Sequence, residues 1–136
     1  MDDVTLLVFP FHDGKLHWSL GLVDKAQRLI IHFDSIPMRT RSFNLFKTMT
    51  KKLLPLLGWE HADWRNLSSH TEWDTQTQKG DTDCGVFVVH WLNHICLGEM
   101  EKARASAINP TLVRGCIAQC LVDQTTTALK LCCVVE

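Results

Sequence analysis

The hydrophobic and polar positions in the first part of the chain are typical of β-strands. Residues 4–9, VTLLVF, form an apolar, β-branched run that predicts a buried strand. Residues 15–24 alternate between apolar and polar side chains, and residues 27–34 predict a third strand after a short turn. Because a short turn joins the second and third strands, the pattern predicts an antiparallel meander of three strands.

A helical period replaces this alternation further along the chain. Apolar side chains recur at helical spacing over residues 41–54, which predicts an amphipathic helix disturbed at Pro55 and closed near Gly58. Residues 59–82 are mostly polar and predict a loop region with one strand near residues 65–72.

Two further helices are expected in the second half. Residues 84–97 are apolar without a break and are followed by Gly98, so their length favours a buried helix over a strand. Asn109 and Pro110 make a good N-cap and first-turn pair for a last helix. The positions expected to face inward on that helix are Val113, Cys116, Ile117, Cys120 and Leu121. The fold class that results is α+β, with antiparallel strands packed against a central helix in a single domain over residues 1–136.

Composition excludes several classes of protein. The chain has 136 residues, 46% of them hydrophobic, yet no apolar run reaches the roughly 18–20 residues of a membrane span. A net charge of −1 offers no electrostatic basis for binding nucleic acid, and the acidic N-terminus lacks the basic region of a signal peptide. We therefore expect an intracellular protein, nuclear or cytoplasmic, with no nucleic-acid or membrane partner. In that setting the six cysteines are expected to be free and reduced.

Histidine and cysteine pairs raise the possibility of a metal site. His90 and His94 lie four residues apart on the expected central helix, and Cys116 and Cys120 have the same spacing on the last one. Together the four side chains would suit tetrahedral zinc. Nothing in the sequence places the two helices against each other, so a zinc-binding module is a lesser alternative and no metal is assigned.

The stretch QKGDTDCGVFVVHW, residues 78–91, suggests a nucleophile. Cys84 lies at the first turn of the expected central helix, where unpaired backbone N–H groups and the helix dipole favour a thiolate. Gly85 would allow a substrate backbone to approach closely. A cysteine nucleophile needs a base and an orienting group, and His17 and Asp34 lie on neighbouring expected strands. Each of these residues also has a purely structural interpretation, as packing, turn or surface positions.

The order of three local segments distinguishes these interpretations. LHWSLGLVD, IIHFDSI and QKGDTDCGVFV resemble, in the same order, the His-Trp, Asp-Ser and Gln-(x5)-Cys-Gly boxes of the Ulp1/SENP family of cysteine proteases. That family processes ubiquitin-like modifiers, chiefly SUMO and, in one branch, NEDD8. The resemblance covers about residues 4–98 and implies a cysteine-proteinase-like fold.

The resemblance also implies a role for each residue. Cys84 would be the nucleophile, His17 the base and acid, and Asp34 the group that orients His17. Gln78 would donate a side-chain N–H to the oxyanion hole, and Trp18 would form one wall of a slot that admits only a Gly-Gly tail. These roles describe a peptidase or isopeptidase that cleaves after the C-terminal Gly-Gly of a modifier and requires no metal or organic cofactor.

Two departures from the family pattern limit this expectation. Gly80 stands where members often carry Asn, and His17 follows only sixteen residues, whereas family catalytic domains have roughly half their chain before the histidine. A short, truncated or divergent member is expected, with apolar surface left exposed near residues 4–9 and a tendency to self-associate. The alternative is a catalytically weak or inactive fragment that binds a modifier or another protein.

Overall fold

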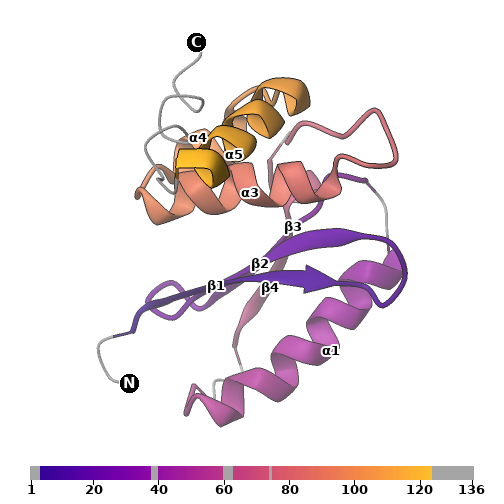
Figure 1. The fold of residues 1–136 in the computed structure, drawn as a ribbon. Helices are drawn as coiled ribbons and strands as arrows, with labels where there is room; N and C mark the ends of the chain where they lie inside the picture. Colours follow the sequence, from indigo (N-terminus) through magenta and orange to yellow (C-terminus); the bar gives the residue numbers. More distant parts are fainter. Residues whose placement is uncertain (1–3, 38–39, 60–62, 74, 124–136) are drawn as a thin grey trace.

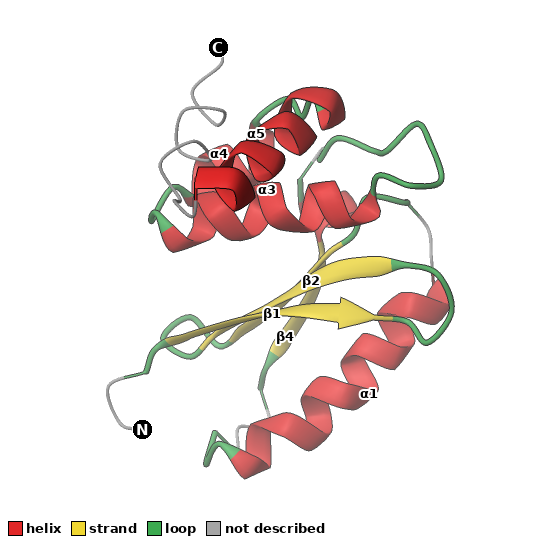
Figure 2. Ribbon diagram, viewed as in Figure 1, coloured by secondary structure: helices red, strands yellow, loops and turns green. Residues whose placement is uncertain are grey.

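A four-stranded sheet between two layers of helices makes up the described part of the chain. The computed structural model describes residues 4–37, 40–59, 63–73 and 75–123. Figures 1 and 2 show one long helix on one face of the sheet and the other labelled helices on the opposite face. The long helix is α1 (Thr40–Leu56), and the opposite layer contains α3 (Cys84–Cys96), α4 (Met100–Ala105) and α5 (Pro110–Asp123).

The sheet has the strand order β1-β2-β3-β4. Its strands are β1 (Leu6–His12), β2 (Trp18–Asp24), β3 (Leu29–Phe33) and β4 (Arg65–Ser68). The first three pair antiparallel, which confirms the predicted meander. The fourth strand pairs parallel to β3, with Ile31 opposite Leu67. This parallel pairing, reached through the crossover helix α1, was not predicted from the sequence.

Two apolar clusters, one on each face, hold the central strands. Leu20 and Leu22 of β2 are buried in a cluster that includes Trp91 of α3. Val23 of the same strand belongs to the opposite cluster, with Phe46 of α1. Because helices cover both faces, β2 and β3 carry apolar side chains in both directions, which explains the nearly continuous apolar sequence of β3.

The α1 helix continues past the predicted end at residue 54. Pro55 lies inside its last turn. A proline at this position removes one backbone N–H donor. Only one residue of the helix follows it, so little of the helix is affected. The chain then closes through Gly58, whose N–H donates to the Pro55 carbonyl at 3.0 Å and whose φ is +69°. The predicted disturbance at Pro55 therefore does not end the helix.

The helices of the second layer agree with the prediction in their main features. The start of α3 at Cys84 and of α5 at Pro110 match the expected ones, and α3 ends one residue before the expected end. Asn109 Oδ1 accepts the N–H of Leu112 at 3.2 Å. Val113 is buried as expected, but Leu121 is 75% exposed, so its predicted inward orientation is wrong. The short helices α2 (Ser69–Glu72) and α4 were not predicted, since each has too few residues to show a period.

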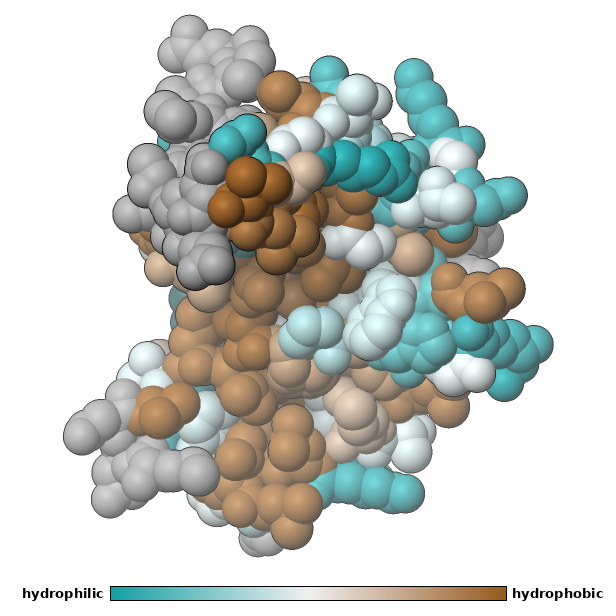
Figure 3. Space-filling view, viewed as in Figure 1, coloured by the Kyte–Doolittle hydropathy of each residue, from teal (hydrophilic) through white to brown (hydrophobic). Residues whose placement is uncertain are grey.

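The β1 edge of the sheet carries exposed apolar side chains. Val4 and Leu6 are exposed, and apolar surface is visible on this side of the molecule in Figure 3. This agrees with the exposure expected near residues 4–9, while self-association stays a prediction. Within the described residues, no helix is both long enough and apolar enough to cross a membrane.

The cysteines do not all match the expected reduced state. Cys84, Cys96 and Cys120 are free thiols, whereas Cys116 is disulfide-bonded. The expectation of free thiols is therefore wrong for Cys116. The remaining two cysteines of the sequence lie outside the described residues.

Gly21 in the middle of β2 generates a stability prediction. A Cβ at this position would lie 2.5 Å from a ring carbon of Phe9 and 2.6 Å from one of Phe46, which is fully buried. We expect Gly21→Ala to lower the free energy of unfolding by about 1–3 kcal/mol, because the core must shift to accept the methyl group. Urea unfolding measures this. Gly115→Ala on α5 is the control, since a Cβ there meets nothing within 4 Å; equal stability of the two variants would contradict the packing.

Two buried histidines have strongly lowered pKa values. Burial lowers the pKa of His32 to about 4, against a smaller opposing effect of the Asp34 charge. Its ring stacks on Phe46 with centroids 4.6 Å apart. Burial also lowers the pKa of His90 to about 4, with a further contribution from the neighbouring His94. Both side chains are therefore neutral in the folded protein near pH 6.

These lowered values predict acid sensitivity. In the unfolded chain each histidine titrates near pH 6.5, so below that pH the unfolded state binds more protons and folding stability falls until about pH 4. Between about pH 7.5 and about pH 5 we expect a loss of up to about 2 kcal/mol per histidine, measured by urea unfolding. His90→Leu should reduce this pH dependence, and the exposed control His12→Leu should retain it. A free energy of unfolding that is the same at both pH values would contradict the prediction.

Candidate active site

A buried histidine–carboxylate pair lies at one end of the sheet. His17 directly precedes β2 and Asp34 directly follows β3, and the antiparallel pairing of these strands brings the two together. His17 Nε2 is 2.6 Å from Asp34 Oδ1, and both residues are 3% exposed. The sequence places these residues on neighbouring strands, and the structure brings them into contact.

Backbone hydrogen bonds position both members of the pair. Asp13 lies in the β1–β2 turn, where its Oδ1 accepts the N–H of His17 at 3.3 Å and its own N–H donates to the His17 carbonyl at 3.1 Å. Asp34 Oδ1 also accepts the N–H of Ile36 at 2.9 Å, and the Asp34 N–H donates to Ser69 Oγ at 3.2 Å. Hydrogen bonds to the backbone of His17 and of Asp34 thus help to fix the positions of the imidazole and the carboxylate.

The contact also determines which nitrogen of His17 can act as a base. An ionised carboxylate only accepts hydrogen bonds, so Nε2 carries the proton that points to Asp34. In the neutral imidazole this leaves Nδ1 as the acceptor. Within the described residues Nδ1 has no hydrogen-bond partner, so it is available to accept a proton.

Cys84 occupies the first position of α3 and is 7% exposed. Figure 1 shows the N-terminal end of α3 at the end of the sheet where β2 begins, which is the end that carries His17. The unpaired N–H groups of this first turn favour a negative charge on the sulfur. Cys84 and His17 form no hydrogen bond in the described part of the chain. Catalytic contacts of this kind often tighten only when substrate binds.

Gln78 is held on both sides of its amide group. Its side-chain Oε1 accepts a hydrogen bond from Ser35 Oγ at 2.5 Å, and its backbone N–H donates to the Ser35 carbonyl at 2.8 Å. The side-chain Nε2 donates to the carbonyl of Gly80. Gln78 thereby lies between the segment that carries Asp34 and the turn that leads to Cys84.

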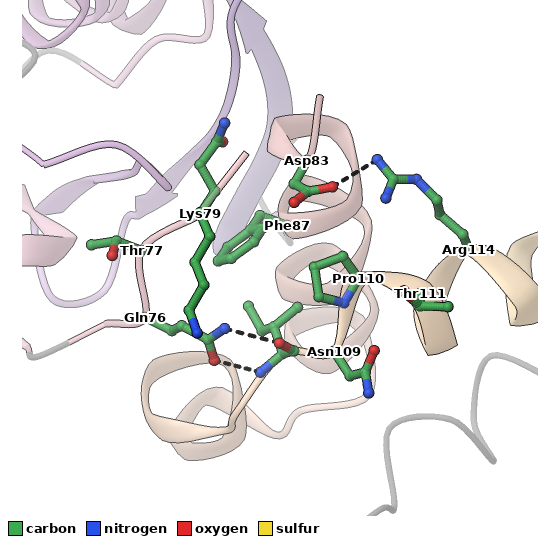
Figure 4. Close-up of a pocket in the computed structure, with 11 residues that line it drawn as sticks. Gln76, Thr77, Lys79, Asp83, Phe87, Asn109, Pro110, Thr111 and Arg114 are labelled. Atoms are coloured by element: carbon green, nitrogen blue, oxygen red, sulfur yellow. Dashed lines mark hydrogen bonds and ion pairs between the residues drawn. The ribbon is translucent and has the colours of Figure 1, made fainter. Parts of the chain in front are cut away.

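The loop before Cys84 is also fastened to α5. Arg114 pairs with Asp83 Oδ1 at 2.7 Å and donates to the Thr82 carbonyl at 2.9 Å. Gln76 exchanges two hydrogen bonds with the backbone of Ile108, at 2.7 and 2.9 Å. Figure 4 shows the Arg114–Asp83 pair and the two hydrogen bonds of Gln76 at a pocket of about 390 Å³ between the loop and α5. The loop that leads to Cys84 is therefore anchored at both ends.

Sequence reasoning missed these anchoring residues. Ser35 was part of the Asp-Ser segment, so a signal was present, but no role was assigned to it. Arg114 gave no signal, because a single arginine on a helix is ordinary surface composition.

The two remaining candidate residues, Trp18 and Gly85, lie on the outside of this arrangement. Trp18 is 44% exposed, and its ring centroid lies 4.7 Å from that of His12. The structural alternative that Trp18 is a core residue is therefore wrong. A Cβ at Gly85 would meet nothing within 4 Å, so packing within the described residues does not require glycine there.

The zinc alternative receives no support from the geometry. Among the residues that the structure describes, no group of three or more His, Cys, Asp or Glu side chains could hold a metal ion. His94 Nδ1 instead contacts Glu99 Oε2 at 2.8 Å. Cys116, one of the four proposed ligands, is disulfide-bonded.

Comparison with known proteins identifies a family. Residues 1–113 match the family described as "Ulp1 protease family, C-terminal catalytic domain". Sentrin-specific protease 3 of Mus musculus and of Homo sapiens are each 32% identical to the chain over 100 residues, covering 69% of this chain and 16% of the relative. NEDD8-specific protease 1 of Arabidopsis thaliana is 30% identical over 102 residues, covering 69% of this chain and 42% of the relative. The chain thus spans less than half the length of these relatives.

Solved structures share the fold. The SUMO protease Ulp1 with its catalytic cysteine oxidised to a sulfenic acid matches with a TM-score of 0.58 at 20% identity, over 71% of this chain and 44% of that one. The C-terminal Ulp1 protease domain in complex with Smt3, the yeast ortholog of SUMO, matches with a TM-score of 0.55 at 18% identity, over 74% and 43%. The predicted α+β, cysteine-proteinase-like fold is confirmed. Since the family match covers most of the sequence, the chain belongs to the Ulp1 protease family.

Proposed function

We propose that this chain is a thiol peptidase or isopeptidase that cleaves after the C-terminal Gly-Gly of a ubiquitin-like modifier of the SUMO or NEDD8 type. The observation that carries the proposal is the buried His17–Asp34 pair, with a hydrogen bond of 2.6 Å, at the end of the sheet where α3 presents Cys84. The family supports the reaction class, and the names of the sentrin-specific and NEDD8-specific relatives support the modifier class.

The geometry leads to a defined sequence of steps. His17 Nδ1 takes the thiol proton of Cys84, and the sulfur attacks the carbonyl carbon of the terminal glycine. Asp34 keeps Nε2 protonated and stabilises the imidazolium that forms. The imidazolium then protonates the departing amine, which leaves a thioester. Water, deprotonated by His17, hydrolyses this thioester and releases the modifier with a free carboxylate.

Negative charge on the carbonyl oxygen needs donors during both steps. The backbone N–H of Cys84 and the side-chain Nε2 of Gln78 are the proposed pair, and losing one such donor typically costs about 3–4 kcal/mol of barrier lowering. Trp18 is half exposed beside His17 and would form one wall of the slot for the Gly-Gly tail. No metal or organic cofactor enters these steps.

A second candidate function is modifier binding with weak or no turnover. The observation that favours it is the lack of a hydrogen bond between Cys84 and His17 in the described part of the chain. The two candidates differ in whether Cys84 reacts when a modifier tail is bound.

Cys84 reactivity distinguishes the two candidates. We expect SUMO or NEDD8 carrying a C-terminal electrophile to form a covalent adduct with the chain, because the helix N-terminus and His17 both favour the thiolate. Intact mass and peptide mapping would locate the adduct. Cys84→Ala should abolish it, while the control Cys96→Ala, which removes an exposed free thiol of the same helix, should leave it unchanged. No adduct with any modifier, or an adduct at Cys96, would favour the binding-only function.

Gly85 provides a prediction in which stability and activity change in opposite directions. Gly85→Ala should raise the free energy of unfolding by about 0.5–1 kcal/mol, since alanine suits a helix better than glycine and the site is open. The same methyl group should displace the substrate backbone by about 1 Å and lower kcat/KM about 100-fold. Urea unfolding and cleavage of a fluorogenic modifier conjugate measure the two effects. Gly115→Ala on α5 is the matched control and should be stabilised with no change in kcat/KM. An unchanged kcat/KM for Gly85→Ala would remove Gly85 from the site.

A further inference from the structure

Ser35 lies between the two parts of the candidate site. It directly follows Asp34, is fully buried, and contacts Gln78 twice. The Ser35 carbonyl accepts the Gln78 backbone N–H at 2.8 Å, and Ser35 Oγ donates to Gln78 Oε1 at 2.5 Å. These contacts join positions 43 residues apart in the chain. Packing alone does not explain why a buried hydroxyl donates a hydrogen bond to the side chain of a proposed oxyanion donor.

The hydrogen-bond partners determine which way the Gln78 amide faces. The Gly80 carbonyl can only accept a hydrogen bond, so the side-chain atom that contacts it must be Nε2. The opposite atom is therefore Oε1, and the Ser35 hydroxyl supplies the donor that this oxygen needs. A primary amide has two N–H groups, and Gly80 takes one of them. The other has no partner within the described residues and remains free for a ligand.

We propose that Ser35 is a positioning residue for the oxyanion hole, which holds the Gln78 amide so that an N–H group, and not its carbonyl oxygen, faces the substrate. The inference rests on the proposed function, in which Gln78 stabilises the oxyanion. Removal of the Ser35 hydroxyl leaves Oε1 without a donor and leaves one hydrogen bond, to Gly80, to resist rotation of the amide. An amide turned by half a revolution presents an oxygen to the developing negative charge and opposes catalysis.

The same short segment also serves the base. Asp34 Oδ1 accepts hydrogen bonds from His17 Nε2 at 2.6 Å and from the Ile36 N–H at 2.9 Å. The residues that follow β3 thus orient the imidazole through one side chain and the oxyanion donor through the next. Ser35 lies in the bend that follows β3, so two adjacent side chains of one short segment hold two different groups of the site.

The first test is a double-mutant cycle on the 136-residue chain, using the modifier conjugate that the unmodified chain cleaves. We expect Ser35→Ala to lower kcat about tenfold, the size of one lost hydrogen bond, with KM little changed. In a Gln78→Ala background the same substitution should cause no further loss, since the group that it positions is absent. Losses that multiply in the double variant would show a structural effect independent of Gln78 and would overturn the inference.

Ser42→Ala is the matched control. Ser42 is a buried serine on α1 whose Oγ has no hydrogen-bond partner among the described residues. Its replacement removes a buried hydroxyl without touching Gln78, so kcat should stay unchanged. Alkylation of Cys84 by iodoacetamide forms no oxyanion, and Ser35→Ala should leave its rate unchanged. A slower alkylation would place the defect at the thiol and contradict the inference.

A second measurement is independent of turnover. The side-chain ¹⁵N amide signals of Gln78, assigned through Gln78→Ala, should report an ordered group in the unmodified chain and a mobile one in Ser35→Ala. Equal order in the two proteins would show that Ser35 does not hold the amide. A chain that cleaves no modifier conjugate overturns the proposed function and the catalytic part of this inference, and the amide signals then still decide whether Ser35 orders Gln78.

Discussion

Phe87 and Trp91 of α3 are buried against Leu20 and Phe33 of the central strands, and this apolar contact determines where Cys84, the proposed nucleophile, lies. The helix axis and its register on the sheet follow from how these large side chains pack. A shift of α3 by one helical turn would move Cys84 by about 5.4 Å and away from the end of the sheet that carries His17. The core and the candidate site therefore depend on the same contact.

The charge of the residue before Cys84 is balanced by a residue from α5. Asp83 immediately precedes Cys84, and an unpaired carboxylate there would disfavour a thiolate. Arg114 of α5 pairs with Asp83 at 2.7 Å and also contacts the Thr82 carbonyl. The pair is partly exposed, so its contribution to stability is small, but it neutralises the charge of the residue that immediately precedes Cys84. The last helix thereby takes part in the site through electrostatics as well as through packing.

The loop that leads to Cys84 is held from two sides by different kinds of contact. On the sheet side, Ser35 binds Gln78. On the α5 side, Ile108 binds Gln76, and Arg114 binds the turn at residues 82–83. Loops of this kind carry functional residues on an otherwise rigid scaffold. Because the backbone of the loop is anchored at several points, little conformational entropy remains to be lost when a substrate arrives.

The sequence by itself determined the elements whose signal is local. Apolar runs and alternation predicted β1 to β3, helical period and the Asn109-Pro110 pair predicted the start of α5, and the resemblance of three segments to a family pattern indicated His17, Asp34 and Cys84 as candidate site residues. These features depend on neighbouring residues, on periods of two or 3.6, and on short turns, so they are visible without a fold.

Tertiary structure decided what depends on partners far along the chain. β4 is only four residues long and owes its parallel pairing to β3 rather than to its own polar sequence. The helix passes Pro55 because it lies in the last turn, and Leu121 is exposed because no element covers it within the described residues. The contacts of Ser35 with Gln78 and of Arg114 with Asp83 span dozens of residues. No local pattern encodes such contacts, since each exists only after the strands and helices have packed and brought the two polar groups within hydrogen-bonding distance.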